Sequence, residues 1–222
     1  MTKEFDRAAL THALSEGAVA LKLALSEKQI TRLIDFLALL SKWNATYNLT
    51  AVRDPAQMVT QHLLDSLAAV SAFSGAKNVL DVGAGGGLPG MVLAIWAAEA
   101  QPAMRVSMVD TVHKKTAFLT QVKAELSLAN VTVHTARVEQ LQTAQKFDVI
   151  TSRAFADLSD FIIWSSHLLE EGGQFIAMKG VAPDDEVARL PEGWTVREVR
   201  HLSVPTMAAE RHLVFIERAA GR

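Results

Sequence analysis

Residues 78–94, with the sequence NVLDVGAGGGLPGMVLA, constrain the fold of this chain more than any other stretch. A short apolar run leads into Asp81, a cluster of glycines follows, and an apolar segment resumes after Pro89. Glycine lets a backbone turn at positive φ and lets a ligand approach without a Cβ atom in the way. The pattern predicts a buried strand, a tight turn around a ligand, and then a helix.

The alternation of short and long apolar segments continues along the chain. Short runs rich in Val, Ile, Met and Phe predict strands at 78–82, 105–110, 131–136, 147–152 and 172–179. Longer apolar or amphipathic segments predict helices at 89–99, 113–127 and 155–170. Buried strands separated by helices form a parallel sheet with helices on both faces. We therefore predict an α/β fold with a doubly wound, Rossmann-like sheet, completed by an antiparallel strand pair within 194–218.

The chain before this region has only helical periodicity. Apolar residues recur at helical spacing over 21–40, where Ser26 is a predicted N-cap. A second helix is predicted over 55–70, where Asp54 is the predicted N-cap before a first-turn proline. The small and polar residues 71–77 predict a link between this helical part and the sheet.

The predicted link divides the chain into an N-terminal helical extension, residues 1–75, and a domain that contains the sheet, residues 76–222. Without cysteine, the chain has no disulfides, thiolate nucleophiles or cysteine-bound metals, and its histidines show no metal-ligand spacing. No long apolar run predicts a membrane span, and the polar, periodic N-terminus differs from a secretory signal. We expect a cytoplasmic protein without a metal. The net charge of −2 gives no overall field that attracts nucleic acid.

One interpretation of the glycine turn is a dinucleotide site. Gly85, Gly87 and Gly90 satisfy the pattern G-x-G-x-x-G, and Asp110 lies where an acidic residue would bind a ribose. That pattern should begin as the strand ends, however, and residues 81–84 separate the apolar run from it. An enzyme of this kind also needs a second nucleotide-binding half and a substrate domain, for which the chain is too short.

The other interpretation is S-adenosylmethionine, whose enzymes show an acidic residue at the end of the first strand followed by G-x-G-x-G. Asp81 followed by Gly83, Gly85 and Gly87 matches this pattern. The cofactor has no pyrophosphate, so the turn would hold an amino acid and a sulfonium, and Asp81 would offset the positive amino group. Asp110, at the end of the second strand, would accept both ribose hydroxyls. We favour this interpretation over the dinucleotide and over a turn that only packs.

Further motifs resemble those of one family. The segments WNATYNLTAVRDP, HLLDSL, DVGAGGGLPG, TSRAFADL, AMKG and ERHLVFIER follow one another from about Leu33 to Arg218. Together they resemble the bacterial small-subunit ribosomal RNA guanine-N7 methyltransferases, also called glucose-inhibited division protein B. The resemblance implies a class I S-adenosylmethionine-dependent methyltransferase sheet. It also implies, as substrate, N7 of one guanine in 16S ribosomal RNA, at position 527 in the 530 loop.

The resemblance implies roles for individual residues as well. The implied contacts with the cofactor are Gly83 and Leu88 at the turn, Asp110 at the ribose, Val138 and Glu139 at the adenine, and Arg153. Relatives often carry Thr or Ser at position 84, where this chain has alanine, so one hydroxyl contact is absent.

Guanine N7 carries a lone pair and no proton, so it attacks a sulfonium methyl without a general base. Catalysis then rests on positioning and on polar contacts. We predict Arg153 for this role because it follows the fourth strand, at the sheet edge where ligands bind; a surface pair with Asp157 is the alternative. Lys179, after the fifth strand, is predicted to hold a phosphate, with a solvated loop lysine as the alternative.

The predicted RNA contacts are scattered in sequence. They are Lys42, Arg53, Arg211 and His212, and ordinary edge-strand polarity is the alternative for the last two. A near-neutral protein should bind naked RNA weakly, so we expect a 30S subunit or an assembly intermediate as substrate. We expect the enzyme to be a monomer.

Two further groups have open interpretations. His62 and Asp65 share a helical face, and we expect either a hydrogen-bonded pair, a cap over the cofactor pocket, or structural bonds to the core. Trp43 and Tyr47 would suit a flipped base, although packing between helices is the commoner role of such a pair. A small-molecule methyltransferase and a nicotinamide-dependent enzyme remain the alternative functions.

Overall fold

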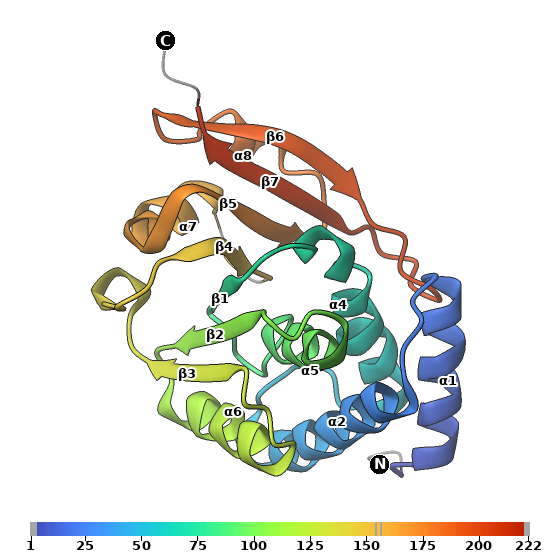
Figure 1. The fold of residues 1–222 in the computed structure, drawn as a ribbon. Helices are drawn as coiled ribbons and strands as arrows, with labels where there is room; N and C mark the ends of the chain where they lie inside the picture. The colour runs from blue at the N-terminus through green and yellow to red at the C-terminus, as the bar shows by residue number, and fades with distance from the viewer. Residues whose placement is uncertain (1–3, 154, 156, 220–222) are drawn as a thin grey trace.

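The structure, a computed structural model, describes residues 4–153, 155 and 157–219. Its centre is a seven-stranded sheet in the order β3-β2-β1-β4-β5-β7-β6 (Figure 1). The parallel strands are β1 (Asn78–Val82), β2 (Arg105–Asp110), β3 (Val131–Thr135), β4 (Phe147–Ser152) and β5 (Leu169–Lys179). The last strand, β7 (His212–Arg218), runs antiparallel to both β5 and β6 (Trp194–His201). The predicted doubly wound sheet with a terminal antiparallel pair is confirmed.

Helices cover both faces of the sheet. On one face, α5 (Gly90–Ala100) packs against β2, and α6 (His113–Glu125) packs against β2 and β3. On the other face, α7 (Leu158–Ser165) packs against β5, and the short α8 (Asp184–Val187) contacts α7 (Figure 1). Because parallel strands end at the same edge, this arrangement gathers the loops after β1, β2, β4 and β5.

The N-terminal part is a series of helices around α5. It comprises α1 (Arg7–Ala20), α2 (Glu27–Tyr47), α3 (Pro55–Met58), a π-helical segment (Val59–Leu64), α4 (Asp65–Leu67) and a 3-10 helix (Val70–Phe73). Ser26 caps α2 by accepting the Gln29 N–H, and the Asp54 carboxylate accepts the Ala56 N–H at the start of α3. Both predicted caps are therefore confirmed.

Several predicted boundaries differ from the structure. Helix α1 was not predicted, because its buried face consists of two leucines, an alanine and a glycine. Helix α2 begins directly after the predicted cap Ser26, so residues 21–25 lie outside it, and it continues to Tyr47, beyond the predicted end at residue 40. The 3-10 helix with its buried Phe73 lies partly within the predicted link 71–77. Strand β5 begins at Leu169 and not at residue 172, because a glycine with φ +77° inside the strand reads as a turn in the sequence. Residue 156, inside the helix predicted over 155–170, lies outside the described residues.

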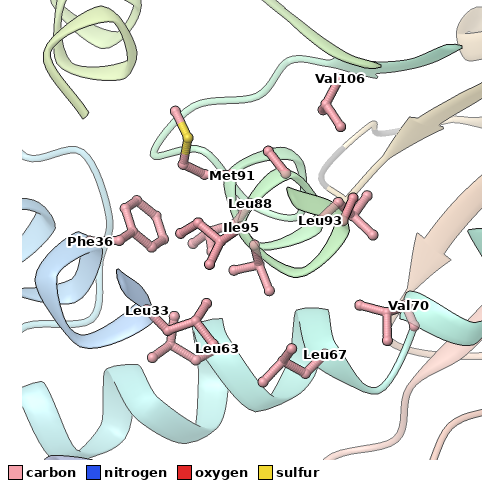
Figure 2. Packing of buried hydrophobic residues seen from close by; sticks show 14 of the residues in the cluster. Leu33, Phe36, Leu63, Leu67, Val70, Leu88, Met91, Leu93, Ile95 and Val106 are labelled. Carbon is pink, nitrogen blue, oxygen red and sulfur yellow. The ribbon is translucent and has the colours of Figure 1, made fainter. Parts of the chain in front are cut away.

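One cluster of buried apolar residues joins the two predicted domains. Figure 2 shows Leu33 and Phe36 of α2 and Leu63 of the π-helical segment packed toward Ile95 of α5. Sheet residues such as Val106 belong to the same cluster. The N-terminal helices thus share one core with α5 and the sheet, and the domain boundary at residue 76 stays a prediction. Within the described ranges, no helix is long and apolar enough to cross a membrane.

Candidate active site

The turn after β1 has the geometry that the S-adenosylmethionine pattern requires. Strand β1 ends at Val82, so Gly83 is the first residue of the turn. Gly83 and Gly85 have φ of +70° and +55°, and a Cβ on Gly83 would meet no atom within 4 Å. The turn therefore leaves an open approach beside Gly83. The register that starts at Gly85 leaves this open glycine unexplained.

Gly87 and Leu88, which were predicted to contact the cofactor, take part in the packing of the protein interior. Gly87 has a φ of +87°, and a Cβ there would lie 2.9 Å from Leu119 Cδ2 and 3.1 Å from Met91 Cβ, so this position favours glycine for the conformation and the packing of the turn. Leu88 is buried in the core cluster. Neither residue lines the pocket described next, and their contact with the cofactor stays a prediction.

A pocket of about 340 Å³ lies at the carboxyl ends of β1 and β2, and we name it the cofactor pocket. Four predicted residues line it, namely Gly83, Asp110, Val138 and Glu139. The sequence did not indicate the other lining side chains, which include Thr111, Lys115, Arg137, Phe155 and Trp164. The rings of Phe155 and Trp164 lie 5.5 Å apart, edge to face, and form an aromatic wall. The sequence signal that could have revealed this wall is a tryptophan in the helix predicted directly after the fourth strand.

The Asp110 side chain binds backbone N–H groups of both the turn after β1 and the turn after β2. Its Oδ2 accepts the Gly85 N–H at 3.0 Å and its Oδ1 accepts the Val112 N–H at 2.9 Å. Lys115 Nζ lies 3.5 Å from the same carboxylate. Each carboxylate oxygen has a second lone pair, so these bonds leave acceptor capacity for ribose hydroxyls.

Asp81 lies fully buried directly before this turn. Its Oδ2 accepts the Gly90 N–H at 2.8 Å, and its Oδ1 has no partner among the described residues. Burial raises the pKa of Asp81 to about 7, against the opposing effects of the Gly90 N–H and of the Arg153 charge. A buried, unpaired carboxylate oxygen normally marks a missing partner. The cofactor pocket and the open Gly83 fit S-adenosylmethionine, and the unpaired oxygen of Asp81, which does not itself line the pocket, fits the positive amino group of that cofactor.

A second pocket of about 340 Å³ lies between the π-helical segment and the carboxyl ends of β4 and β5, and we name it the basic pocket. Its lining residues are Gln61, His62, Asp65, Arg153, Met178, Lys179, Gly180 and Arg211. The structure thus brings together Arg153, Lys179 and Arg211, which were predicted separately. Because Arg153 affects the pKa of Asp81, it also connects this pocket electrostatically with the cofactor turn.

Asp65 holds two of these cations. Its Oδ2 accepts a hydrogen bond from Arg153 Nη1 at 3.1 Å, and its Oδ1 accepts one from Arg211 Nε at 2.8 Å. The alternative surface pair of Arg153 with Asp157 is wrong, because Asp157 pairs with Arg189 at 3.3 Å. Arg153, at the end of β4, pairs with the buried charge of Asp65, which is distant in sequence, and not with its near neighbour Asp157.

His62 makes a structural bond and does not pair with Asp65. Its Nε2 lies 2.9 Å from the Thr50 hydroxyl. Burial, followed by the charge of Arg153, lowers the pKa of His62 to about 4, so the ring is neutral at physiological pH. Of the interpretations of His62 and Asp65, the structural bond holds for His62, while Asp65 bonds to the arginines.

Lys179 is already engaged. Its Nζ donates to the Phe155 carbonyl at 3.1 Å and to the Glu186 carboxylate at 2.7 Å. The alternative of a solvated loop lysine is wrong, and a phosphate here would have to displace Glu186. The function of Lys179 in binding phosphate stays a prediction.

The other predicted RNA contacts lie outside the basic pocket. His212 Nδ1 is 3.2 Å from the Gly180 carbonyl, beside the pocket. Lys42 and Arg53 are exposed on the N-terminal part, and Arg53 donates to the Asn48 amide at 2.7 Å. The ring centroid of Trp43 lies 5.6 Å from that of Phe118 and 5.0 Å from that of Tyr47, which supports a packing role for this aromatic group. Within the described ranges, no group of three acidic or histidine side chains is placed to hold a metal.

Comparison with known proteins agrees with this geometry. Residues 29–214 match the family described as GidB, rRNA small subunit methyltransferase G. The ribosomal RNA small subunit methyltransferase G of Herminiimonas arsenicoxydans is 78% identical over 97% of this chain and 99% of its own length. That of Janthinobacterium sp. (strain Marseille) is 79% identical over 97% and 98%.

A solved structure supports the fold. The N-methyltransferase NodS from Bradyrhizobium japonicum WM9, in complex with S-adenosyl-l-homocysteine, superposes with a TM-score of 0.54 and 15% identity, covering 81% of this chain and all of its own. Such low identity supports the sheet architecture alone, whereas the family match and the relatives span the whole site. The chain therefore belongs to the rRNA small subunit methyltransferase G family.

Proposed function

We propose that this protein transfers the methyl group of S-adenosylmethionine to N7 of one guanine in 16S ribosomal RNA, and that this guanine lies in the 530 loop. The observation that carries the proposal is the adjacency of two pockets at one edge of the sheet. Arg153 lines the basic pocket, and its charge lowers the pKa of Asp81, which lies directly before the turn that lines the cofactor pocket. A cofactor and a nucleotide substrate would meet at this arginine.

Family membership confirms the coarser prediction of an S-adenosylmethionine-dependent ribosomal RNA methyltransferase. The nicotinamide and small-molecule alternatives are set aside. The choice of N7, the 530 loop and the residue roles are parts of the proposal.

The chemistry of N7 suits the groups in the two pockets. S-adenosylmethionine, when bound, supplies an activated methyl group. Guanine N7 has a lone pair and carries no proton, so no side chain has to remove one. The chain's own residues then have two tasks, which are to hold the two molecules at reacting distance and to accommodate the charge that develops on the base.

The electrostatics of the site favour a structured RNA particle over naked RNA. Carboxylates already engage the three cations of the basic pocket, Asp65 holding two arginines and Glu186 holding Lys179. Only one net positive charge remains in this pocket to attract phosphates from solution, because paired charges largely cancel at a distance. The proposed substrate is therefore a 30S subunit or its precursor, in the cytoplasm.

We also propose that the protein acts as a monomer. The large apolar side chains that remain exposed come from several separate segments, and scattered apolar residues are normal on monomers. They are Val19, Tyr47, Ile163, Trp164, Val181 and Val199.

The test is methylation of 30S subunits that carry unmethylated 16S RNA, in parallel with a protein-free fragment of the 530 loop. Labelled methyl groups should appear in 30S particles, and primer extension after cleavage at N7-methylguanine should stop at one position in the 530 loop. Arg153→Gln should slow transfer, whereas Arg7→Gln, at an exposed ion pair on α1, should not. Label at another region of the RNA would refute the 530 loop, and equal rates on the short fragment would refute the need for a particle.

A further inference from the structure

Asp65 is a buried carboxylate that the proposed chemistry does not require. Its side chain is 1% exposed, and it lies at the start of α4 in the N-terminal part of the chain. A carboxylate this deeply buried costs free energy unless charged or polar groups compensate it. Both of its compensating groups, Arg153 and Arg211, come from the part of the chain that contains the sheet.

The two partners reach Asp65 from different elements. Arg153 follows β4, and Arg211 immediately precedes β7. Each arginine uses one N–H group on a different oxygen of Asp65. A second bond fixes each guanidinium further, since Arg153 donates to the Gln61 carbonyl at 3.0 Å and Arg211 donates to the Glu210 carbonyl at 2.8 Å.

These bonds leave a defined set of donors free. An arginine offers five N–H groups in a rigid planar fork. Within the part of the chain that the structure describes, Arg153 Nε and Nη2 and Arg211 Nη2 have no hydrogen-bond partner. Both arginines line the basic pocket. Fixed N–H groups of this kind suit the oxygen acceptors of a nucleotide, because less side-chain entropy is lost when the substrate binds.

We propose that Asp65 is a positioning residue, which holds Arg153 and Arg211 so that their free N–H groups bind oxygen acceptors of the target nucleotide. The proposal rests on the proposed function, because it assumes that the target nucleotide occupies the basic pocket. Asp65 itself does not touch the substrate. It acts through the orientation of the two arginines.

Electrostatics and positioning predict opposite effects of removing this charge. Without Asp65 the pocket gains positive charge, which favours RNA binding. The two guanidinium groups lose their common anchor, however, and become mobile. Positioning therefore predicts a lower kcat with an unchanged or lower KM for the RNA particle. If Asp65 only stabilised the fold, its removal would reduce the amount of folded protein. The apparent kcat, the cofactor-binding capacity and the thermal stability would then fall together.

The experiment compares Asp65→Asn with wild type and with Asp35→Asn, whose carboxylate forms an exposed ion pair with Arg7. For each protein, methylation of 30S particles gives kcat and KM, and calorimetry gives the affinity and the number of sites for S-adenosylmethionine. We expect kcat of Asp65→Asn to fall by about 10- to 100-fold, as for a misplaced binding group. Its KM should not rise, its number of cofactor sites should stay at one per chain, and Asp35→Asn should behave as wild type.

A double-mutant cycle adds a second test that does not depend on one substitution. If Asp65 acts through Arg211, the losses in Asp65→Asn and Arg211→Gln should not add, and the double variant should be about as slow as the slower single variant. Additive losses, a kcat within about twofold of wild type, or a parallel loss of cofactor sites would overturn the proposal. Wild-type protein that binds the cofactor but leaves the 530 loop unmethylated would overturn the proposed function together with it.

Discussion

Asp81→Asn should abolish a proton exchange that accompanies cofactor binding. Burial raises the pKa of Asp81 to about 7, so this carboxyl group is mostly protonated in the free protein at pH 6. The positive amino group of S-adenosylmethionine should favour the ionised carboxylate, because an opposite charge nearby lowers a carboxyl pKa. Binding below pH 7 should therefore release a proton from Asp81.

The size of the effect follows from the pKa. With a pKa of about 7, binding should release about 0.9 proton per site at pH 6 and about 0.5 at pH 7. The apparent association constant should rise about fifteenfold from pH 5.5 to pH 7, in proportion to the ionised fraction of Asp81. This range lies below the ordinary pKa of an α-amino group, about 7.7–8.0, so the cofactor's amine stays mostly charged throughout.

The assay is calorimetric titration in two buffers of different protonation enthalpy, at pH 5.5, 6 and 7. Asp81→Asn should bind more weakly and exchange no proton, whereas Asp35→Asn should keep the wild-type exchange. Arg153→Gln should shift the pH dependence upward, because the charge of Arg153 lowers the pKa of Asp81. If wild type exchanges no proton across this range, or if Asp81→Asn exchanges as much as wild type, then Asp81 does not offset the amino group.

Three further variants test other parts of the site. Gly83→Arg should weaken cofactor binding at least about tenfold, since binding depends on the space at this turn. The control is Gly193→Arg, because Gly193 has a similar φ of +82° and a Cβ there would also meet no atom within 4 Å; it should leave binding intact in the same titration. His62 binds a proton less readily in the folded than in the unfolded chain, so its contribution to stability is complete above about pH 6.5 and is lost as the pH falls toward 4. Between pH 7 and pH 5 the free energy of unfolding in urea should therefore fall by about 2 kcal/mol more for wild type than for His62→Asn, and equal falls would contradict the pKa. Gly90→Ala should lower the unfolding free energy by about 1–3 kcal/mol, because its Cβ would lie 2.7 Å from both Asp81 Oδ2 and Met108 Cγ; a thermal melt unchanged from wild type would show that the turn relaxes freely.

Local patterns predicted the cofactor turn because its parts are neighbours in sequence. The strand end, Asp81 and Gly83 lie within a few residues of one another, and positive φ at Gly83 depends mainly on the residue type. The aromatic wall was missed because Trp164 reaches the cofactor pocket only through the packing of α7 on the sheet. Helix α1 was missed because small residues give a weak apolar period.

The basic pocket was beyond local patterns for a different reason. Asp65 and Arg211 are separated by 146 residues, and only the order of strands in the sheet brings them together. Motifs indicated which side chains lie at strand ends. They did not indicate that one buried carboxylate from the N-terminal helices binds two of them, nor that Lys179 pairs with Glu186.

The most direct measurement is mass spectrometry of nucleosides from 30S subunits incubated with the purified protein and S-adenosylmethionine. The predicted result is one equivalent of N7-methylguanosine per 16S RNA, absent with Gly83→Arg and present with Gly193→Arg. A methyl group on another base or on a ribose, or no methylated nucleoside from protein that binds the cofactor, would contradict the proposed reaction at guanine N7.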